Sequence, residues 1–265
     1  LGHPCSRYID RLMVEQMVQG LPSDLSKSSP HEPPCPACIM GKGVRAPFPR
    51  SQTKPTRVLE YVHIDTAGKF SKPGVHREQY FVMLYDAFSG WREVLLIQHK
   101  WQIPEQVKHV LLRWMNLTGQ RIRYIRTDRG SEFTGHTLVD WALSEGITLQ
   151  TSCPYTPQQN GTAERAIRTT KDRSRCMMMG VRGPPSLWSE AVQYAAYVSN
   201  YLPVEGRPVT PYEAFLGRKP DVSNLRVWDC MAYIRVPDRY RGPFDPVFIP
   251  GMFVGIDPST KGWKI

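Results

Sequence analysis

The chain has 265 residues, a length that suits one large domain or two to three small ones. Hydrophobic residues make up 41% of it and charged residues 22%, which excludes the disordered and fibrous classes. Lys and Arg exceed Asp and Glu by 34 to 24, and this net charge of +10 predicts a polyanionic partner, nucleic acid before a membrane surface or an acidic protein. Because neither a membrane span nor a secretory signal is visible, we expect an intracellular protein without a membrane partner.

The first 52 residues have weak hydrophobic periodicity, unlike the segment that follows them. An amphipathic stretch over residues 9–18 leads into Ser- and Pro-rich sequence, and the pair Cys35 and Cys38 precedes a basic run. Six cysteines are too few for a disulfide framework in a chain of this length, and a Cys-x-x-Cys spacing is typical of metal ligands. We therefore predict a small independent module over residues 1–52.

Strands alternate with helices from about residue 53 to residue 205. Apolar and alternating segments predict the strands, and apolar residues at helical spacing predict the helices. The expected strands are 58–65, 80–85, 91–97, 121–128 and 147–153, and the expected helices are 107–117, ended by Gly119, then 137–144, 161–179 and 184–201. This order predicts an α/β fold, a mixed five-stranded sheet flanked by helices.

Beyond residue 206 the expected elements become mainly strands. A short helix over 211–216 precedes β-type segments over 226–236 and 248–256, which Pro- and Gly-rich turns separate. We expect residues 206–265 to begin a β-rich module that binds DNA or a partner. The chain begins at Leu1 and stops inside an expected strand, so we expect it to be part of a longer protein.

Three carboxylates stand at the ends of expected elements. Asp65 ends the first strand, Asp128 ends the fourth, and Glu164 follows Asp128 after 35 intervening residues, in the first turn of a helix. If the first and fourth strands are neighbours, Asp65 and Asp128 emerge side by side. Three convergent carboxylates can hold two Mg²⁺ ions for an in-line phosphoryl displacement. Acidic residues at such positions are more often caps or solvated groups, so the pattern by itself does not establish a site.

The residues around these carboxylates resemble the catalytic core of retroviral-type integrases, specifically the copia-type LTR retrotransposon branch. The resemblance extends over essentially the whole chain. The motifs that carry it are Leu1-Gly2-His3, Cys35-x-x-Cys38-x-x-Gly41-Lys42, His63-x-Asp65, Thr127-Asp128-Arg129-Gly130-Ser131-Glu132-Phe133, Asn160-Gly161-x-Ala163-Glu164-Arg165, Thr210-Pro211-Tyr212-Glu213, Gly217-Arg218-Lys219-Pro220 and Phe253-Val254-Gly255.

The resemblance implies an RNase H-like core over residues 53–205 with Asp65, Asp128 and Glu164 as the metal-binding triad. It implies two Mg²⁺ or Mn²⁺ ions per active site, with Asp65 bridging both. The implied reactions are DNA 3′-end processing and strand transfer, which join element DNA to target DNA. The implied partners are double-stranded DNA and further copies of the chain. The resemblance also implies a piece of a Gag-Pol polyprotein, assembled in cytoplasmic particles and acting in the nucleus.

Two other functions stay open from the sequence. One is a different RNase H-like nuclease or a cut-and-paste transposase, against which the Cys pair and the motifs after residue 206 argue. The other is a catalytically silent or domesticated DNA-binding relative. All three triad positions hold carboxylates, as an active site requires, but intact ligands do not prove activity.

The resemblance also implies a structural Zn²⁺ site in the N-terminal module, with His3, Cys35 and Cys38 as ligands. A closed zinc site needs four N or S ligands. In the family the first His of the module lies a few residues before Leu-Gly-His, a position ahead of Leu1. Cys5 or His31 could substitute for it, although Cys5 stands only two residues from His3 and would chelate awkwardly.

The helix that carries Glu164 has a basic face. Glu164, Arg168, Lys171 and Arg175 fall at offsets 0, 4, 7 and 11 and so share one face. A row of cations that starts at a metal ligand suits the phosphates of a DNA end. The residues expected to contact DNA are Asn160, Arg165, Arg168, Lys171 and Arg175. The alternative is a solvated charged face without a ligand.

Other acidic residues and cysteines serve as controls for this interpretation. We expect Asp86 and Asp172 to be structural, with Asp172 on its helix away from Glu164, and Glu132 to order the turn after Asp128 and not to bind metal. Cys153, Cys176 and Cys230 have no ligand-like neighbours, and we expect them to be buried small apolar residues.

Overall fold

The computed structural model describes residues 3, 6–20, 35–43, 55–128, 130–151, 161–180, 183–257, 260 and 262–265. The chain forms two compact units, Leu1–Arg50 and Ser51–Ile265, and each is described by itself. In the described ranges, no helix has the length and apolar character to cross a membrane.

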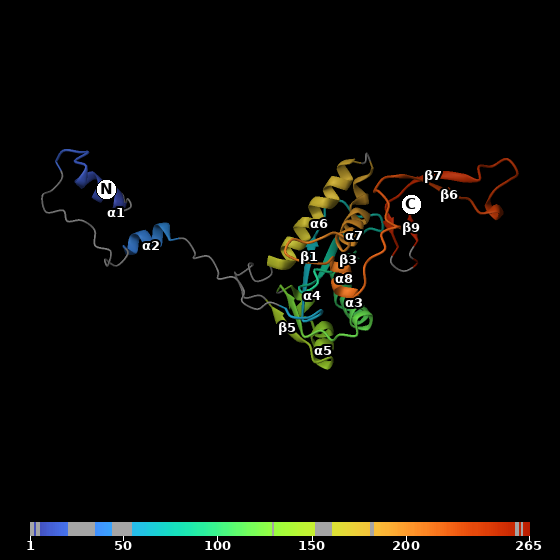
Figure 1. The fold of residues 1–265 in the computed structure, drawn as a ribbon, viewed down its shortest axis with the longest axis horizontal. Helices are drawn as coiled ribbons and strands as arrows, with labels where there is room; N and C mark the ends of the chain where they lie inside the picture. The colour runs from blue at the N-terminus through green and yellow to red at the C-terminus, as the bar shows by residue number, and fades with distance from the viewer. Residues whose placement is uncertain are drawn as a thin grey trace. The chain divides into compact units, whose positions relative to one another are not determined.

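A five-stranded sheet with the order β3-β2-β1-β4-β5 lies at the centre of the second unit (Figure 1). Its strands are β1 (Tyr61–Gly68), β2 (Tyr80–Asp86), β3 (Arg92–Ile97), β4 (Tyr124–Thr127) and β5 (Thr148–Thr151). The first three are antiparallel neighbours, while β4 pairs in parallel with β1 and β5 in parallel with β4. This mixed sheet confirms the predicted RNase H-like α/β architecture, and β1 and β4 are neighbours, which meets the condition for Asp65 and Asp128 to emerge side by side.

Helices cover both faces of this sheet. They are α3 (Ile103–Thr118), α4 (Ser131–Thr134), α5 (His136–Ser144), α6 (Gly161–Gly180), α7 (Trp188–Ser199) and α8 (Pro211–Leu216), with 3₁₀ turns η1 (Lys100–Gln102), η3 (Pro185–Leu187) and η4 (Asp238–Tyr240). The helix α6 packs on β1 and β2, and α7 packs on β3 and on α6 (Figure 1). The sequence did not predict α4 or η1, both of which are too short to show a periodic pattern.

Strand β2 shows why its sequence is apolar without interruption. Val82 and Leu84 are fully buried with α3 and α5 on one side of the sheet. Phe81 and Met83 are fully buried with α6 and α7 on the other side. Because successive side chains of a strand point to opposite faces, a strand covered on both faces must be apolar throughout.

Helix α3 buries the predicted face and ends where the sequence indicated. Val107, Leu111 and Trp114 are fully buried, and Gly119 closes the helix with a left-handed φ of 65°. Leu117, which was expected on the same face, is 57% exposed. At about 100° per residue Leu117 lies roughly 80° around the helix from Val107, at the margin of the buried stripe.

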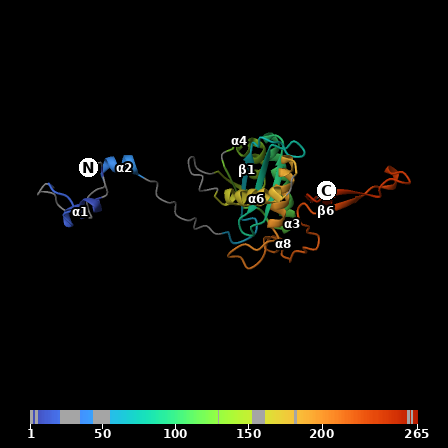
Figure 2. The same cartoon turned by 90° about the horizontal axis from the view of Figure 1, so that it is seen from above.

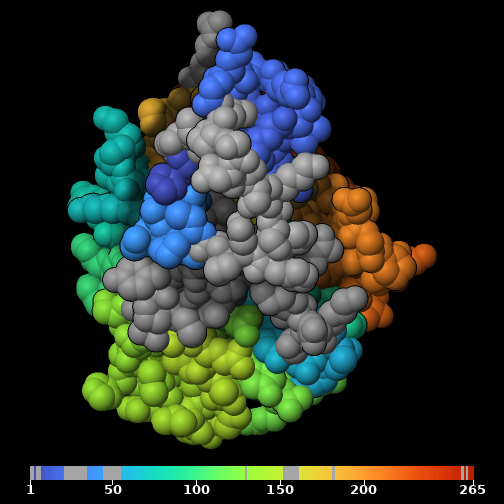
Figure 3. Space-filling view, turned by 90° about the vertical axis from the view of Figure 1, so that its left-hand side faces the viewer, coloured from blue at the N-terminus to red at the C-terminus, as the bar shows by residue number. Residues whose placement is uncertain are grey.

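Strand β5 and helix α5 form the outer edge of the sheet region. Every residue of β5 is exposed or half-buried, as suits an edge strand. Helix α5 buries Leu138 and Ala142 against the core and exposes Asp140 and Leu143. The segment around α5 forms the lower, yellow-green part of the surface drawn in Figure 3.

The C-terminal strands are shorter than the expected segments. A hairpin of β6 (Met231–Arg235) and β7 (Phe248–Met252) extends away from the sheet and its helices (Figure 2), and β8 (Gly255–Ile256) pairs with β9 (Trp263–Lys264). Lys264 Nζ contacts Glu190 Oε2 of α7 at 2.8 Å. These strands therefore lie in the same compact unit as the sheet, and a separate module over 206–265 stays a prediction.

Two helices are described in the first unit, α1 (Ser6–Val14) and α2 (Pro36–Lys42). None of the side chains described in this unit is buried. The described residues of this unit therefore form no apolar core of their own.

Candidate active site and metal centres

Asp65 and Asp128 lie at equivalent levels of two neighbouring strands. Val62 of β1 stands opposite Ile125 of β4, and His63 opposite Arg126, in parallel register. Continuing this register by two residues brings Asp65 to the level of Asp128. Both side chains are half-buried, so each keeps access to solvent and to a ligand.

Glu164 shares a groove with Asp65. The groove has a volume of about 470 Å³ and runs between the end of β1 and one face of α6. Its lining residues are Asp65, Thr66, Ala67, Gly68, Glu164, Ile167, Arg168, Lys171, Asp172 and Arg175. The adjacent side of α6 buries mostly small residues, namely Ala163, Ala166, Thr170 and Ser174, which lets the helix approach the sheet closely, and the buried Ile167 lies where this side meets the groove.

The charges of the three carboxylates act on one another. Burial, followed by the negative charge of Asp128 and then that of Glu164, raises the pKa of Asp65 to about 6. The backbone N–H of Thr66, which donates to Asp65 Oδ1 at 2.9 Å, and the cation of Lys171 oppose this shift in pKa. A divalent cation bound between these carboxylates would neutralise their mutual repulsion. Because Mg²⁺ and Mn²⁺ prefer oxygen ligands, the residues fit either ion.

The carboxylate oxygens of Asp65, Asp128 and Glu164 are not gathered around one point. Within the described ranges, only one group of three potential ligands has all its ligand atoms within 4.8 Å of one another, and it lies in the other unit. The oxygens of Asp65, Asp128 and Glu164 are therefore spread more widely.

The basic face of α6 is present, and all four of its residues border the groove. Arg168, Lys171 and Arg175 line the groove. Lys171 Nζ lies 5.6 Å from the ring centre of Phe70, a cation–π distance. Arg165 is exposed outside the groove lining, with Thr162 Oγ1 at 3.4 Å from its Nη2. Asn160 lies outside the described residues.

The acidic residues that were expected to be structural agree with the structure only in part. Asp86 is structural as expected, because its buried carboxylate accepts hydrogen bonds from Leu59 N and from the N and Oγ of Ser89. The expected position of Asp172 was wrong, because it lines the same groove as Glu164, where it pairs with Arg175 at 2.9 Å; its structural role stays a prediction. Eight residues correspond to a rotation of only about 80° around a helix, so Asp172 stays close to the groove-facing side.

Cys176 is exposed, contrary to expectation, because it falls on the outer side of α6, while Cys230 is half-buried and Cys153 lies outside the described residues. Glu132 is buried and forms an ion pair with Lys100. The sequence reasoning assigned Lys100 no role, since its partner lies 32 residues away and no local pattern links the two.

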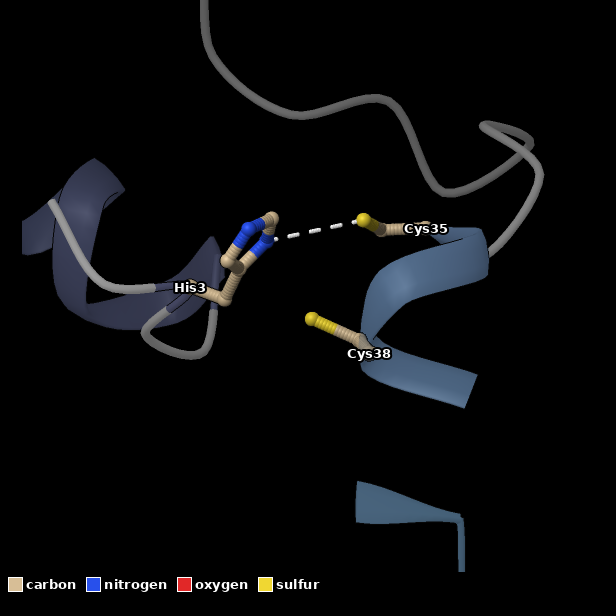
Figure 4. Close-up of side chains that lie close together, drawn as sticks. All are labelled: His3, Cys35 and Cys38. Atoms are coloured by element: carbon tan, nitrogen blue, oxygen red, sulfur yellow. Dashed lines mark hydrogen bonds between the residues drawn. The ribbon is translucent and has the colours of Figure 1, made fainter. Parts of the chain in front are cut away.

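The candidate zinc ligands converge in the first unit. The ligand atoms of His3, Cys35 and Cys38 all lie within 4.8 Å of one another, and the imidazole of His3 points toward both thiols (Figure 4). His3 Nδ1 lies 3.6 Å from Cys35 Sγ. Tetrahedral Zn²⁺ with ordinary Zn–N and Zn–S bonds would set these atoms roughly 3.6 Å apart, so the residues fit the ion.

Helix α2 explains how the two cysteines come together. Cys35 precedes the helix and Cys38 lies in its first turn, so their thiols project to the same side (Figure 4). Backbone N–H groups of Cys38 and Ala37 lower the pKa of Cys35, which favours the thiolate that binds metal. The two residues considered as a fourth ligand, Cys5 and His31, lie outside the described residues.

Comparisons with known proteins show what the sheet region is similar to. Residues 55–157 match the integrase core domain. The chain is 31% identical over 235 residues to the retrovirus-related Pol polyprotein from transposon TNT 1-94 of Nicotiana tabacum, an alignment that covers 88% of this chain and 18% of that protein. It is 28% identical over 241 residues to the Pol polyprotein from transposon RE1 of Arabidopsis thaliana, with 88% and 15% covered. The chain thus spans less than a fifth of these relatives.

A solved structure supports the fold as well. The cryo-EM structure of the simian T-cell lymphotropic virus intasome in complex with PP2A regulatory subunit B56 gamma is similar with a TM-score of 0.55 at 18% identity, covering 83% of this chain and 76% of that one. The predicted resemblance to retrotransposon integrases is confirmed. Residues 55–157 match the integrase core domain, in a chain similar over most of its length to the Pol polyproteins of plant retrotransposons.

Proposed function

We propose that this chain is the integrase part of a retrotransposon Pol polyprotein and acts as a polynucleotidyl transferase on DNA. It processes the 3′ ends of element DNA and joins them to target DNA by strand transfer. One observation carries the proposal: within an integrase core domain, Asp65 stands level with Asp128 and shares with Glu164 a groove that three cations of α6 also line.

The triad Asp65, Asp128 and Glu164 would hold two Mg²⁺ or Mn²⁺ ions. Such ions, when bound, activate an attacking oxygen and stabilise a leaving oxygen in a phosphoryl displacement. The oxygen donors and the effect of Asp128 and Glu164 on the pKa of Asp65 support this assignment. The protein's own part is to fix the three carboxylates on two strands and a helix and to orient the DNA phosphate between them.

The cations of α6 would hold the DNA backbone next to this triad. Arg168, Lys171 and Arg175 line the groove, and each could neutralise one phosphate. Asn160 and Arg165 would contact the DNA beyond the groove, near the start of the same helix. Phosphate contacts of this kind position the DNA and do not read its sequence.

In the N-terminal unit, His3, Cys35 and Cys38 would hold a structural Zn²⁺ with a fourth ligand. The short distances between their ligand atoms support the assignment. The ion would take the place of the apolar core that the described part of this unit does not have.

The partners would be the two ends of the element DNA, the target DNA and further copies of the chain. Joining two ends to one target needs more than one active site, hence a homo-oligomer on DNA. The similar simian virus structure is that of an intasome. The reaction would take place in the nucleus, after assembly in cytoplasmic particles.

A strand-transfer assay tests the proposal. The protein is incubated with Mg²⁺ or Mn²⁺, a labelled duplex that carries an element end, and a target plasmid. We expect joined products from the parent and none from Asp128→Asn, which removes one ligand charge at nearly constant shape. Asp140→Asn is the matched control, because Asp140 is an exposed carboxylate on α5.

The outcomes separate the competing functions. Products from the parent and from Asp140→Asn alone support the integrase assignment. An absence of products with either metal contradicts it and favours a silent DNA-binding relative. Equal products from Asp128→Asn would show that the chemistry uses other residues.

A further inference from the structure

Lys100 and Glu132 form an ion pair at the edge of the carboxylate site. Lys100 Nζ lies 2.8 Å from Glu132 Oε1, and the Glu132 side chain is 4% exposed while that of Lys100 is 49% exposed. Lys100 also lies 5.8 Å from the ring centre of Tyr80. The pair joins η1, which follows β3, to α4, which follows the Asp128 turn, so two distant segments meet here.

Gly130 links this pair to the metal-binding turn. Its backbone N–H donates to Asp128 Oδ1 at 3.0 Å. A Cβ atom at Gly130 would lie 2.8 Å from Glu132 Oε2 and 3.1 Å from Asp128 Oδ1. The carboxylates of Glu132 and Asp128 are thus no more than about 6 Å apart, within the range of strong charge interaction.

Lys100 therefore has two negatively charged neighbours, Glu132, which is its ion-pair partner, and Asp128, which is a candidate metal ligand. The charges of Glu132 and Asp128 both raise the pKa of Lys100, with the Glu132 hydrogen bond as the largest cause. A lysine carries its charge on a flexible four-carbon stem and can move between such partners. An ammonium bound to Asp128 would occupy the oxygen that the metal ion needs.

We propose that Glu132 is a positioning residue that retains the Lys100 ammonium and so leaves Asp128 free to bind the metal ion. The inference rests on the proposed function, because Asp128 is taken as a metal ligand. Glu132 acts through Lys100 and is not itself a ligand. The Glu132 carboxylate is buried, and a buried charge is costly unless it is paired with an opposite charge. Lys100 supplies that charge.

The proposal predicts an unusual order of variants. Glu132→Gln removes the charge that retains Lys100, so the ammonium moves toward Asp128 and competes with the metal ion. Removing both charges, in Lys100→Met with Glu132→Gln, abolishes this competitor and restores metal binding. A purely structural ion pair predicts no such recovery, since the double variant would then bind metal no better than Glu132→Gln.

Direct Mn²⁺ binding to the full chain tests this order. Isothermal titration calorimetry is run on protein that already contains Zn²⁺, so that the N-terminal ligands are occupied. We expect Glu132→Gln to raise the dissociation constant for Mn²⁺ about tenfold, and the double variant to return it to within about twofold of the parent. Glu145→Gln is the matched control, because it removes the partner of Arg121, at 2.7 Å, in an ion pair at the end of α5.

Asp128→Asn separates this inference from the proposed function. If Asp128→Asn loses Mn²⁺ binding while Glu132→Gln keeps it, the role of Glu132 is wrong and the metal site stands. If the double variant is as weak as Glu132→Gln, the pair is structural and the inference fails. If the parent and Asp128→Asn bind Mn²⁺ alike, both the metal site and the inference fail. Circular dichroism and thermal melting of each variant establish that it is folded.

Discussion

The two candidate metal sites are built in opposite ways. In the N-terminal unit, the nitrogen and sulfur atoms of His3, Cys35 and Cys38 gather within 4.8 Å of one another. Asp65 and Glu164 line the groove and Asp128 follows the neighbouring strand at the level of Asp65, but the oxygens of these three carboxylates are farther apart. An imidazole and thiols can approach while uncharged, whereas three carboxylates repel one another until a cation joins them.

The surroundings of the two sites differ in the same sense. None of the side chains described in residues 3–20 and 35–43 is buried. The groove lies on a sheet with clusters of buried residues on both faces. The comparison indicates that zinc would determine the fold of the first unit, while the fold of the second unit would determine where magnesium binds.

Removal of zinc is the strongest test of this contrast. Chelation, or Cys38→Ser, should unfold residues 1–50, because structural zinc contributes about 10 kcal/mol to folding in small modules. Limited proteolysis measures the effect as new cleavage confined to this unit, while the melting of the sheet unit is unchanged. Cys176→Ser is the matched control, since Cys176 is exposed on α6. Protection of residues 1–50 that survives chelation would break the contrast.

Relief of carboxylate repulsion should give the next largest effect. The folded state raises the pKa of Asp65 to about 6, so at pH 8, without added divalent cation, its ionised form opposes folding. Asp65→Asn should therefore stabilise the sheet unit by about 1–3 kcal/mol in urea unfolding at pH 8.

The pH dependence gives this prediction its sign. Below the unfolded pKa near 4, Asp65 is protonated in both states, so the advantage of Asp65→Asn should vanish as the pH falls through 6 to 4. Saturating Mg²⁺ at pH 8 should reverse the order of the two proteins, because only the parent keeps all three ligands. Asp140→Asn should change neither value, and a gain that persists at pH 4 would refute the repulsion.

Charge reversal along the groove should have the smallest effect in free energy. It tests which face of α6 would contact DNA. Arg168→Glu with Lys171→Glu should weaken binding of an element end roughly tenfold at 0.1 M salt and reduce the salt slope by about 2, as expected for two lost phosphate contacts. Fluorescence anisotropy over a salt series measures both. Arg165→Glu, outside the groove lining, should have less than half this effect. Equal effects would extend the DNA-binding surface around the helix.

Much of the site could be predicted because its signals are local. Asp65 and Asp128 end apolar strands, and Arg168, Lys171 and Arg175 follow the helical period; the groove brings Asp65 and these cations together as expected. The expectation for Asp172 failed because helical offset alone does not reveal how wide an arc a groove exposes. The segment 226–236 contains only a five-residue strand, since Trp228 packs instead with α7.

The sequence alone determined the order of the elements, the residue types at the two sites and the excess of basic charge, because periodicity and residue chemistry are properties of neighbouring positions. Only the tertiary structure decided that Lys100 contacts Glu132 beside Asp128, that Asp172 borders the groove, and that the carboxylates lie farther apart than the candidate zinc ligands. These facts depend on contacts between residues far apart in the chain and on the balance of charges in space, which no local pattern encodes.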